Sequence, residues 1–271
     1  MIKIITKISF TALLLLSLSA CNDNTKKENE FNPSLPMPST KGLSNMGLIG
    51  IAHDAKKDPI PATKIGYAYS EKLKDYEKAL EWFKYSDSMK SMPQNSNYAC
   101  YALQQLKKYE EAIAWCEKAI NLGNDEALIG LGYSYSKLNN YNESIKWYLE
   151  ASKKNHPDAF INLGTVYSNT GDYKNSEKYY KEAIKNNDYQ AYQGIAKLYH
   201  DKIKDDIKAS AYAIAVINTK YTKSSVLDLL KNTWNIPNET IKKGYELQLN
   251  SPDFPIKFKG DLGLEEWINH L

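Results

Sequence analysis

Arginine is absent from this 271-residue chain, and all of its 35 basic residues are lysines. Bidentate recognition of phosphates and guanine edges usually relies on the guanidinium group, so this absence argues against a nucleic-acid partner. The chain also lacks a large excess of charge of either sign. The net charge is +3, and removal of residues 1–20 leaves 33 lysines against 32 acidic residues. Net charge therefore predicts no electrostatic steering of a partner.

Motifs of catalysis and metal binding are missing as well. The sequence has no phosphate-binding loop, no nucleophile elbow and no glycine-rich dinucleotide turn. The neighbouring carboxylates Glu110-Glu111, Asp205-Asp206 and Glu265-Glu266 lie where we expect turns and helix starts. The four histidines lie in separate segments without a metal-ligand spacing: His53, His156, His200 and His270. We therefore expect a protein that is not an enzyme and that uses no metal or other cofactor.

The first 21 residues carry the most specific short signal. Lys3 and Lys7 precede an apolar segment, 8–18, that is too short to span a bilayer. Leu18-Ser19-Ala20-Cys21 then resembles the lipobox of bacterial lipoproteins. This resemblance implies a signal peptide at 1–20, acylation of Cys21, and anchoring to a membrane. Asn22 follows the cysteine where inner-membrane retention would require aspartate, which favours the outer membrane. The alternative is an ordinary secretory leader with a chance cysteine.

Residues 21–57 are predicted to form the lipidated N-terminus and a flexible tether. They are rich in asparagine, lysine, proline and serine, and have little periodic hydrophobicity. One part, 43–51, is more apolar than a linker requires. This part either packs on the following domain or docks a partner.

A repeated pattern organises residues 58–219. Small residues recur at intervals of 33, 32, 32 and 33, each followed by aromatic or apolar residues: Ala79, Ala112, Ser144, Ser176 and Ala209. Such a period indicates a solenoid of stacked helix pairs. A small residue on one helix lets its partner helix approach closely, while the aromatic residues fill the space towards the next pair.

These residues resemble the tetratricopeptide repeat family and its Sel-one-like relatives. Leu131-Gly132, Tyr135, Ser144, Tyr148 and Ala151 match the tetratricopeptide pattern, and 75–83 looks like a Sel-one-like turn and second helix. The resemblance implies an all-α, right-handed superhelical solenoid of about five repeats. It also implies protein–protein scaffolding, with a concave groove formed by the first helices.

Residues 220–271 are predicted to cap the solenoid. Segments 224–234 and 237–249 form one more helix pair with a weaker signature, as a terminal unit requires. The aromatic stretch 251–271, which contains Phe254, Phe258 and Trp267, either folds back on the last repeats or docks a partner.

The family register also predicts which side chains face the groove. The residue after the small position of each first helix faces inward: Tyr67, Tyr101, Tyr133, Thr165 and Lys197. One turn before them lie Thr63, Asn97, Ile129, Ile161 and Gln193, and one turn after them Ser70, Gln104, Ser136, Ser168 and His200.

Apart from Lys197, this predicted surface has no formal charge. We therefore expect it to hold an extended internal segment of a partner protein, with apolar side chains on Tyr101, Tyr133, Ile129 and Ile161 and polar contacts at the edges. The candidate contact residues are Tyr67, Tyr101, Tyr133, Ile129, Ile161, Gln104, Gln193 and His200. Alternatively, the tyrosines pack only against one another, or residues 251–271 cover them.

Two cysteines remain besides Cys21. In the repeat register Cys100 lies opposite Ala112, which places Cys116 one helical turn further along. Added to the distance between helix axes, this offset predicts a Cα separation above the ~7 Å limit for a disulfide. We expect two buried thiols.

These observations favour a lipid-anchored adaptor that faces the periplasm and assists assembly of a cell-envelope complex. Its partner would be a segment of an envelope protein, without nucleic acid or metal. Two alternatives remain: a surface-exposed or secreted repeat protein that acts on other cells, and a peptidoglycan-associated binding protein.

Overall fold

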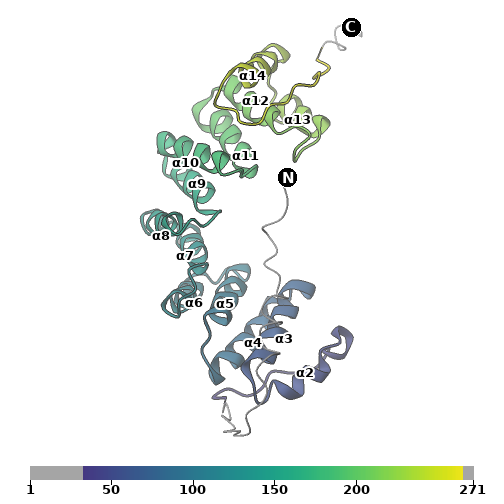
Figure 1. The fold of residues 1–271 in the computed structure, drawn as a ribbon, viewed down its shortest axis with the longest axis vertical. Coiled ribbons are helices and arrows are strands. Elements are labelled where there is room, and N and C mark those ends of the chain that lie inside the picture. Colours follow the sequence, from purple (N-terminus) through teal and green to yellow (C-terminus); the bar gives the residue numbers. More distant parts are fainter. Residues whose placement is uncertain (1–32, 265–271) are drawn as a thin grey trace, which may run out of the picture.

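The computed structural model describes residues 33–264, and within this range the chain is helical apart from its turns and an extended carboxyl-terminal segment (Figure 1). The predicted signal peptide, Cys21 and Trp267 lie outside the described residues. The helices are α2 Ile49–Asp54, α3 Pro59–Ala68, α4 Tyr76–Met89, α5 Pro93–Gln105, α6 Tyr109–Asn121, α7 Ala127–Lys137, α8 Tyr141–Lys153, α9 Ala159–Thr170, α10 Tyr173–Lys185, α11 Gln190–Lys197, α12 Asp206–Ala215, α13 Lys223–Asp228 and α14 Asn238–Asn250. Within 33–264 none is long and apolar enough to cross a bilayer.

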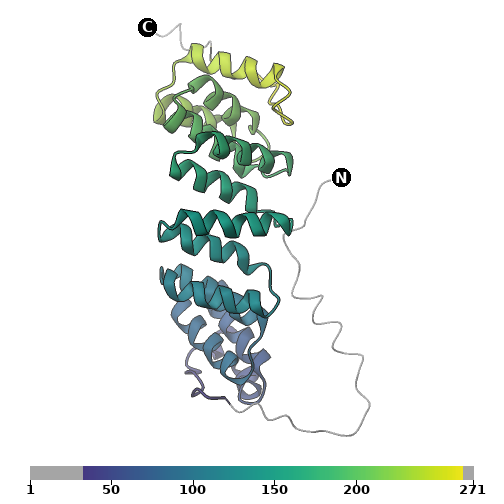
Figure 2. The same cartoon turned by 90° about the vertical axis from the view of Figure 1, so that its left-hand side faces the viewer.

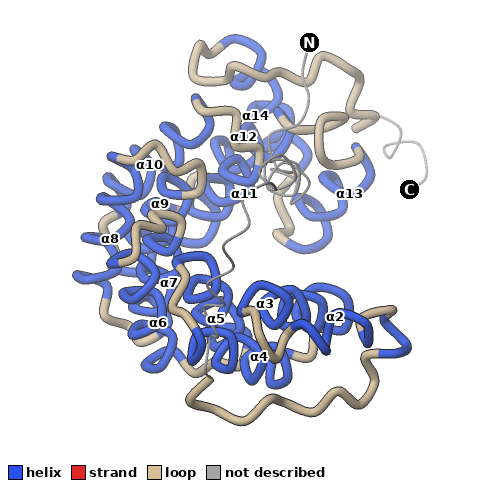
Figure 3. Tube along the Cα trace, turned by 60° about the horizontal axis from the view of Figure 1, so that its bottom comes forward, coloured by secondary structure: helices blue, strands red, loops and turns tan. Residues whose placement is uncertain are grey.

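Five consecutive helix pairs, α3/α4 to α11/α12, stack into the predicted solenoid, and α13 and α14 follow in the predicted capping region, where α14 packs on α12. The stack bends into an arc (Figures 1 and 3). Its second helices, including α6, α8 and α10, lie on the outer side, while α5, α7 and α11 lie towards the inside. Figure 2 shows the helices stacked along the long axis. The all-α solenoid is therefore confirmed.

Side-chain caps start most of the second helices. Asp75 Oδ1 accepts a hydrogen bond from the Lys78 backbone N–H at 3.1 Å. Equivalent caps start α8, α10 and α12, with Asn140, Asp172 and Asp205 as acceptors. Such a cap satisfies one otherwise unpaired amide and contributes about 1 kcal/mol.

The first and fifth repeats are one residue longer than the others, and local changes in helical winding absorb the addition. α3 continues into a π-helical turn, Tyr69–Leu73, and α11 into another, Leu198–Ile203. Both π turns end at a lysine in the left-handed conformation. The stacking of the repeats therefore continues despite the different lengths.

The contact between the two helices of a repeat depends on a residue without a side chain. A Cβ atom added at Gly164 would lie 2.6 Å from Cδ1 of Tyr180, and one at Gly132 would lie 2.7 Å from Cδ1 of Tyr148. The small residue of the second helix also binds the first helix directly: Ser176 Oγ donates a hydrogen bond to the Gly164 carbonyl at 2.7 Å. This geometry confirms the packing predicted from the small residues.

The segment before the first repeat is not all tether. Leu43 is fully buried, and Met46, Leu48 and Ile51 pack against the core of the first repeats. Short helices, Ser44–Met46 and α2, form this contact. Residues 43–51 therefore pack on the first repeat, which was one of the two predicted alternatives for this stretch. The flexible tether predicted as far as residue 57 does not extend over 43–57, since these apolar side chains cover the open face of the first repeat.

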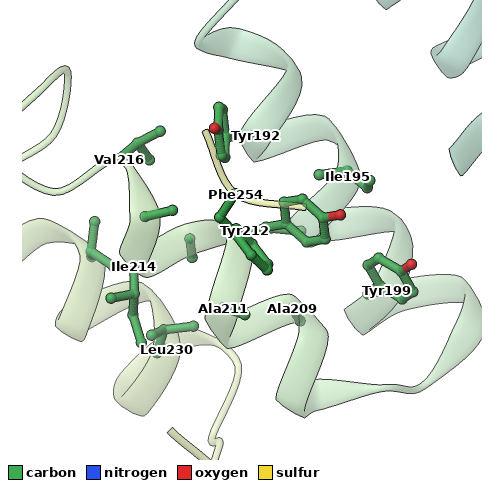
Figure 4. Packing of buried hydrophobic residues seen from close by; sticks show 14 of the residues in the cluster. Tyr192, Ile195, Tyr199, Ala209, Ala211, Tyr212, Ile214, Val216, Leu230 and Phe254 are labelled. Atoms are coloured by element: carbon green, nitrogen blue, oxygen red, sulfur yellow. The ribbon is translucent and has the colours of Figure 1, made fainter. Parts of the chain in front are cut away.

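The carboxyl-terminal segment folds back on the last repeats. Phe254 packs on Tyr212 (Figure 4), and their ring centroids are 4.6 Å apart. Phe258 is also buried. The Gln248 side chain fixes the segment by donating to the Phe258 carbonyl at 2.7 Å and accepting from its N–H at 3.1 Å. Residues 251–264 therefore cover the terminal face of the solenoid.

We predict that Gly164→Ala lowers the free energy of unfolding by about 1–3 kcal/mol, because the new methyl group must displace the buried ring of Tyr180. Gly50→Ala is the matched control. It lies in α2 with no atom within 4 Å of the added Cβ, so the gain in helix propensity should leave stability unchanged or raise it. Denaturant unfolding measures both. Equal stability of the two variants would contradict the account of the helix contact.

Candidate functional site

A cavity of about 590 Å³ opens on the inner side of the first four repeats. It spans the first helices α3, α5 and α7 and the start of α9. Its lining contains five of the predicted contact residues: Tyr67, Tyr101, Gln104, Ile129 and Tyr133. Residues 251–264 do not line it. The carboxyl-terminal segment therefore leaves this part of the groove open.

Tyrosine rings form much of the cavity wall. Tyr67 and Tyr101 each keep 39% of their surface exposed, although neighbouring rings hold them in place. The Tyr67 and Tyr98 centroids are 5.3 Å apart, and Tyr76 meets Tyr101 edge-on at 6.1 Å. Burial, followed by the proximity of Tyr76, raises the pKa of Tyr101 to about 12. Tyr101 is therefore a neutral hydrogen-bonding group at physiological pH.

Charge in the groove differs from the prediction. Glu71, Glu126 and Asp158 line the cavity, and no lysine does. Glu71 pairs with Lys74 at 3.4 Å on the exposed surface. Neither the Glu126 nor the Asp158 carboxylate has an ion-pair or hydrogen-bond partner within residues 33–264. The expectation of a groove without formal charge is therefore wrong.

A periodic signal for these carboxylates is present in the sequence. Glu126 and Asp158 lie one 32-residue repeat apart, and each precedes an inward position, Tyr133 or Thr165, by seven residues. Seven residues are two helical turns, so the side chains share one face. The prediction considered one turn on either side of the inward positions, and so it missed residues at the helix starts.

Three segments match a family model described as "Tetratricopeptide repeat": residues 97–123, 125–153 and 157–188. They correspond to the second, third and fourth helix pairs. The chain therefore contains tetratricopeptide repeats. A search of curated proteins found no significant match to the sequence.

Solved structures with similar folds include Pseudomonas aeruginosa pilF, with 17% identity and a TM-score of 0.55 over 76% of this chain and 96% of that one. PilW, described as a widely conserved type IV pilus biogenesis factor, shares 18% identity with a TM-score of 0.54 over 72% and 96%. YrrB, described as a TPR protein with an unusual peptide-binding site, shares 19% identity with a TM-score of 0.50 over 68% and 97%. At these identities the likeness concerns the fold.

The second tetratricopeptide repeat differs from its neighbours at the helix contact. Cys100 and Cys116 form a disulfide, and their Cα atoms are 5.2 Å apart. The expectation of two separate thiols is therefore wrong. The reason is the register: Cys100 and Cys116 occupy the positions of Gly132 and Tyr148 in the third repeat, which touch directly. Cys100 can lie opposite Ala112 and still contact Cys116, one helical turn further along the second helix.

The second repeat has Cys116 at the position of Tyr148 in the third repeat. Cys100 and Gly130 lie in the lining of the cavity, and the carboxamide of Gln104 occupies the space beside them. Gln104 Nε2 donates to the Gly130 carbonyl at 2.6 Å and to Ser134 Oγ at 3.0 Å. Gln104 is therefore a buried link between the second and third repeats, whereas the prediction placed it among partner contacts.

The remaining predicted contact residues lie outside this cavity. Ile161 lies beside the next inter-repeat turn. Gln193 accepts a hydrogen bond from Tyr221 at 3.0 Å, and His200 stacks on Trp234 with a centroid distance of 4.5 Å. The capping unit thus contacts both Gln193 and His200. Within 33–264, no group of three potential metal-ligating side chains was found.

We predict that breaking the disulfide lowers the free energy of unfolding by about 2–4 kcal/mol, because the link closes a loop of 16 residues in the unfolded chain. Thermal unfolding of the wild type with and without dithiothreitol measures the effect. The Cys100→Ala/Cys116→Ala variant is the control and should not respond to the reductant. A thiol assay that detects both cysteines free in the oxidised, unfolded protein would contradict the pairing.

Proposed function

We propose that this protein is a lipid-anchored adaptor that holds an extended segment of another cell-envelope protein in the groove of its first four repeats. The cavity of about 590 Å³ on the inner face carries the proposal. It combines partly exposed tyrosine rings with unpaired carboxylates, and this combination suits recognition of a polypeptide. Tyrosine offers a large amphipathic contact at a low entropic cost.

Anchoring is supported by the lipobox-like sequence that ends at Cys21. Acyl chains on this residue would hold the repeats close to the membrane, with Asn22 favouring the outer membrane and an orientation towards the periplasm. The Cys100–Cys116 disulfide supports export, because such links persist mainly in oxidising compartments.

A role in assembly is supported by the fold neighbours. PilW is described as a pilus biogenesis factor and YrrB as having a peptide-binding site. We extend these two properties to this chain as part of the proposal, since a curved stack of helix pairs presents a continuous inner surface to a linear partner.

We predict that the mature protein begins at an acylated Cys21 and fractionates with membranes. Mass spectrometry of the amino-terminal peptide measures the modification. The Cys21→Ala variant should leave the membrane fraction, because no acyl chain can be attached. Membrane association that survives this substitution would contradict the anchor.

We predict that truncation of the groove tyrosines weakens partner binding. Tyr101→Ala and Tyr133→Ala should each cost about 1–3 kcal/mol if the rings contact the partner directly. The measurement is recovery of the partner from crosslinked native cells, together with the unfolding temperature. Lys146→Ala is the control, since this exposed side chain lies on the outer helix α8 and pairs with Glu143. Unchanged recovery with the Tyr101→Ala/Tyr133→Ala double variant would overturn the groove as the binding site.

A further inference from the structure

We infer that the groove selects a partner segment that carries lysine or arginine side chains between apolar residues. This inference rests on the proposed function and specifies the chemistry of the partner. Its basis is the charge on the cavity lining, where Glu71, Glu126 and Asp158 contribute carboxylates and no lysine is present, His156 being the one imidazole in the lining.

Two of these carboxylates are available to a ligand. Glu126 and Asp158 are exposed at the starts of α7 and α9, and neither is engaged by another side chain within 33–264. In contrast, the adjacent Asp125 pairs with Lys154 at 3.0 Å. A carboxylate that faces a cavity without a counter-ion favours a cationic occupant, and an acidic segment would meet repulsion.

The aromatic rings between the carboxylates point to the same occupant. Burial raises the pKa of the Tyr98 phenol, and the negative charges of Glu126 and Glu71 contribute to this rise. The ring of Tyr98 therefore lies within the field of both carboxylates. Tyr133 already accepts a cation on its ring, because Lys137 Nζ lies 5.1 Å from the ring centroid. A lysine or arginine of the partner can rest on such a ring while its charge meets a carboxylate.

Overall charge does not explain this selectivity. The net charge of the chain is +3, so the whole molecule does not attract cations. The attraction is local to the first four repeats, and at this surface exposure salt should screen it. Apolar side chains of the partner would meet Tyr101 and Ile129 between the charged contacts.

The test uses the full chain in detergent and fluorescein-labelled hexapeptides, followed by fluorescence anisotropy. One peptide alternates leucine and lysine, and a second alternates leucine and glutamate. We expect the wild type to bind the lysine peptide at least tenfold more tightly. Glu126→Gln/Asp158→Asn should weaken binding of the lysine peptide about three- to tenfold, as expected for two exposed ion pairs.

The matched control is Asp125→Asn/Glu150→Gln. It removes the same amount of charge from two exposed carboxylates that do not line the cavity, so it should leave the affinity unchanged. Equal weakening in both variants would show attraction by overall charge and would overturn the inference. Absence of a lysine preference in the wild type, including absence of any binding, would overturn it too.

Failure of this inference can be distinguished from failure of the proposed function. A native partner that is lost from the Tyr101→Ala/Tyr133→Ala variant, but whose contacting segment is acidic, would leave groove binding intact and refute the charge selection. A native partner that the tyrosine variant still recovers would instead refute groove binding itself.

Discussion

The close approach of the two helices within each repeat is the contact on which the rest of the structure depends. An aromatic ring of the second helix lies directly on a glycine of the first, as at Gly132 and Tyr148, where an added Cβ would lie 2.7 Å from the ring. This approach sets the distance between helices and leaves the inner face to the other side chains of the first helix. Repetition of close helix contacts produces the curved stack. In the second repeat the disulfide between Cys100 and Cys116 takes the place of the glycine–ring contact, and Cys100 lies in the lining of the cavity.

Much of the fold could be predicted because small residues recur in the sequence wherever two helices of a repeat pack closely. The spacing of the small residues from Ala79 to Ala209 predicts five helix pairs, and the structure contains them. The weaker predictions concern contacts that do not repeat. Leu43 packs against the first repeat although its surroundings have the composition of a linker. Composition describes the average of a segment, whereas a few buried apolar side chains decide whether it is ordered.

In the groove, too, the sequence predicted the repeating positions but not the contacts of individual side chains. The repeat register predicted that Tyr101, Tyr133 and Ile129 face inward, because the spacing of residues defines the face of a helix. All three line one cavity. The register could not show that Gln104 turns into the repeat junction or that the capping unit engages His200, because these outcomes depend on neighbouring helices. The carboxylates at the helix starts alter the chemistry of the surface from neutral to acidic. They change the expected partner from a segment with apolar side chains and uncharged polar contacts to one that also carries positive charge.

Site-specific photo-crosslinking in native cells tests the central claim, which is that the inner face holds a segment of a partner protein. A photoreactive amino acid replaces Tyr101 on the inner face or Lys146 on the outer helix α8, and mass spectrometry identifies the crosslinked peptides. The account predicts that the probe at position 101 captures one recurrent peptide with basic and apolar residues, and that the probe at position 146 does not. Capture of the same peptide from position 146, with none from position 101, would contradict it.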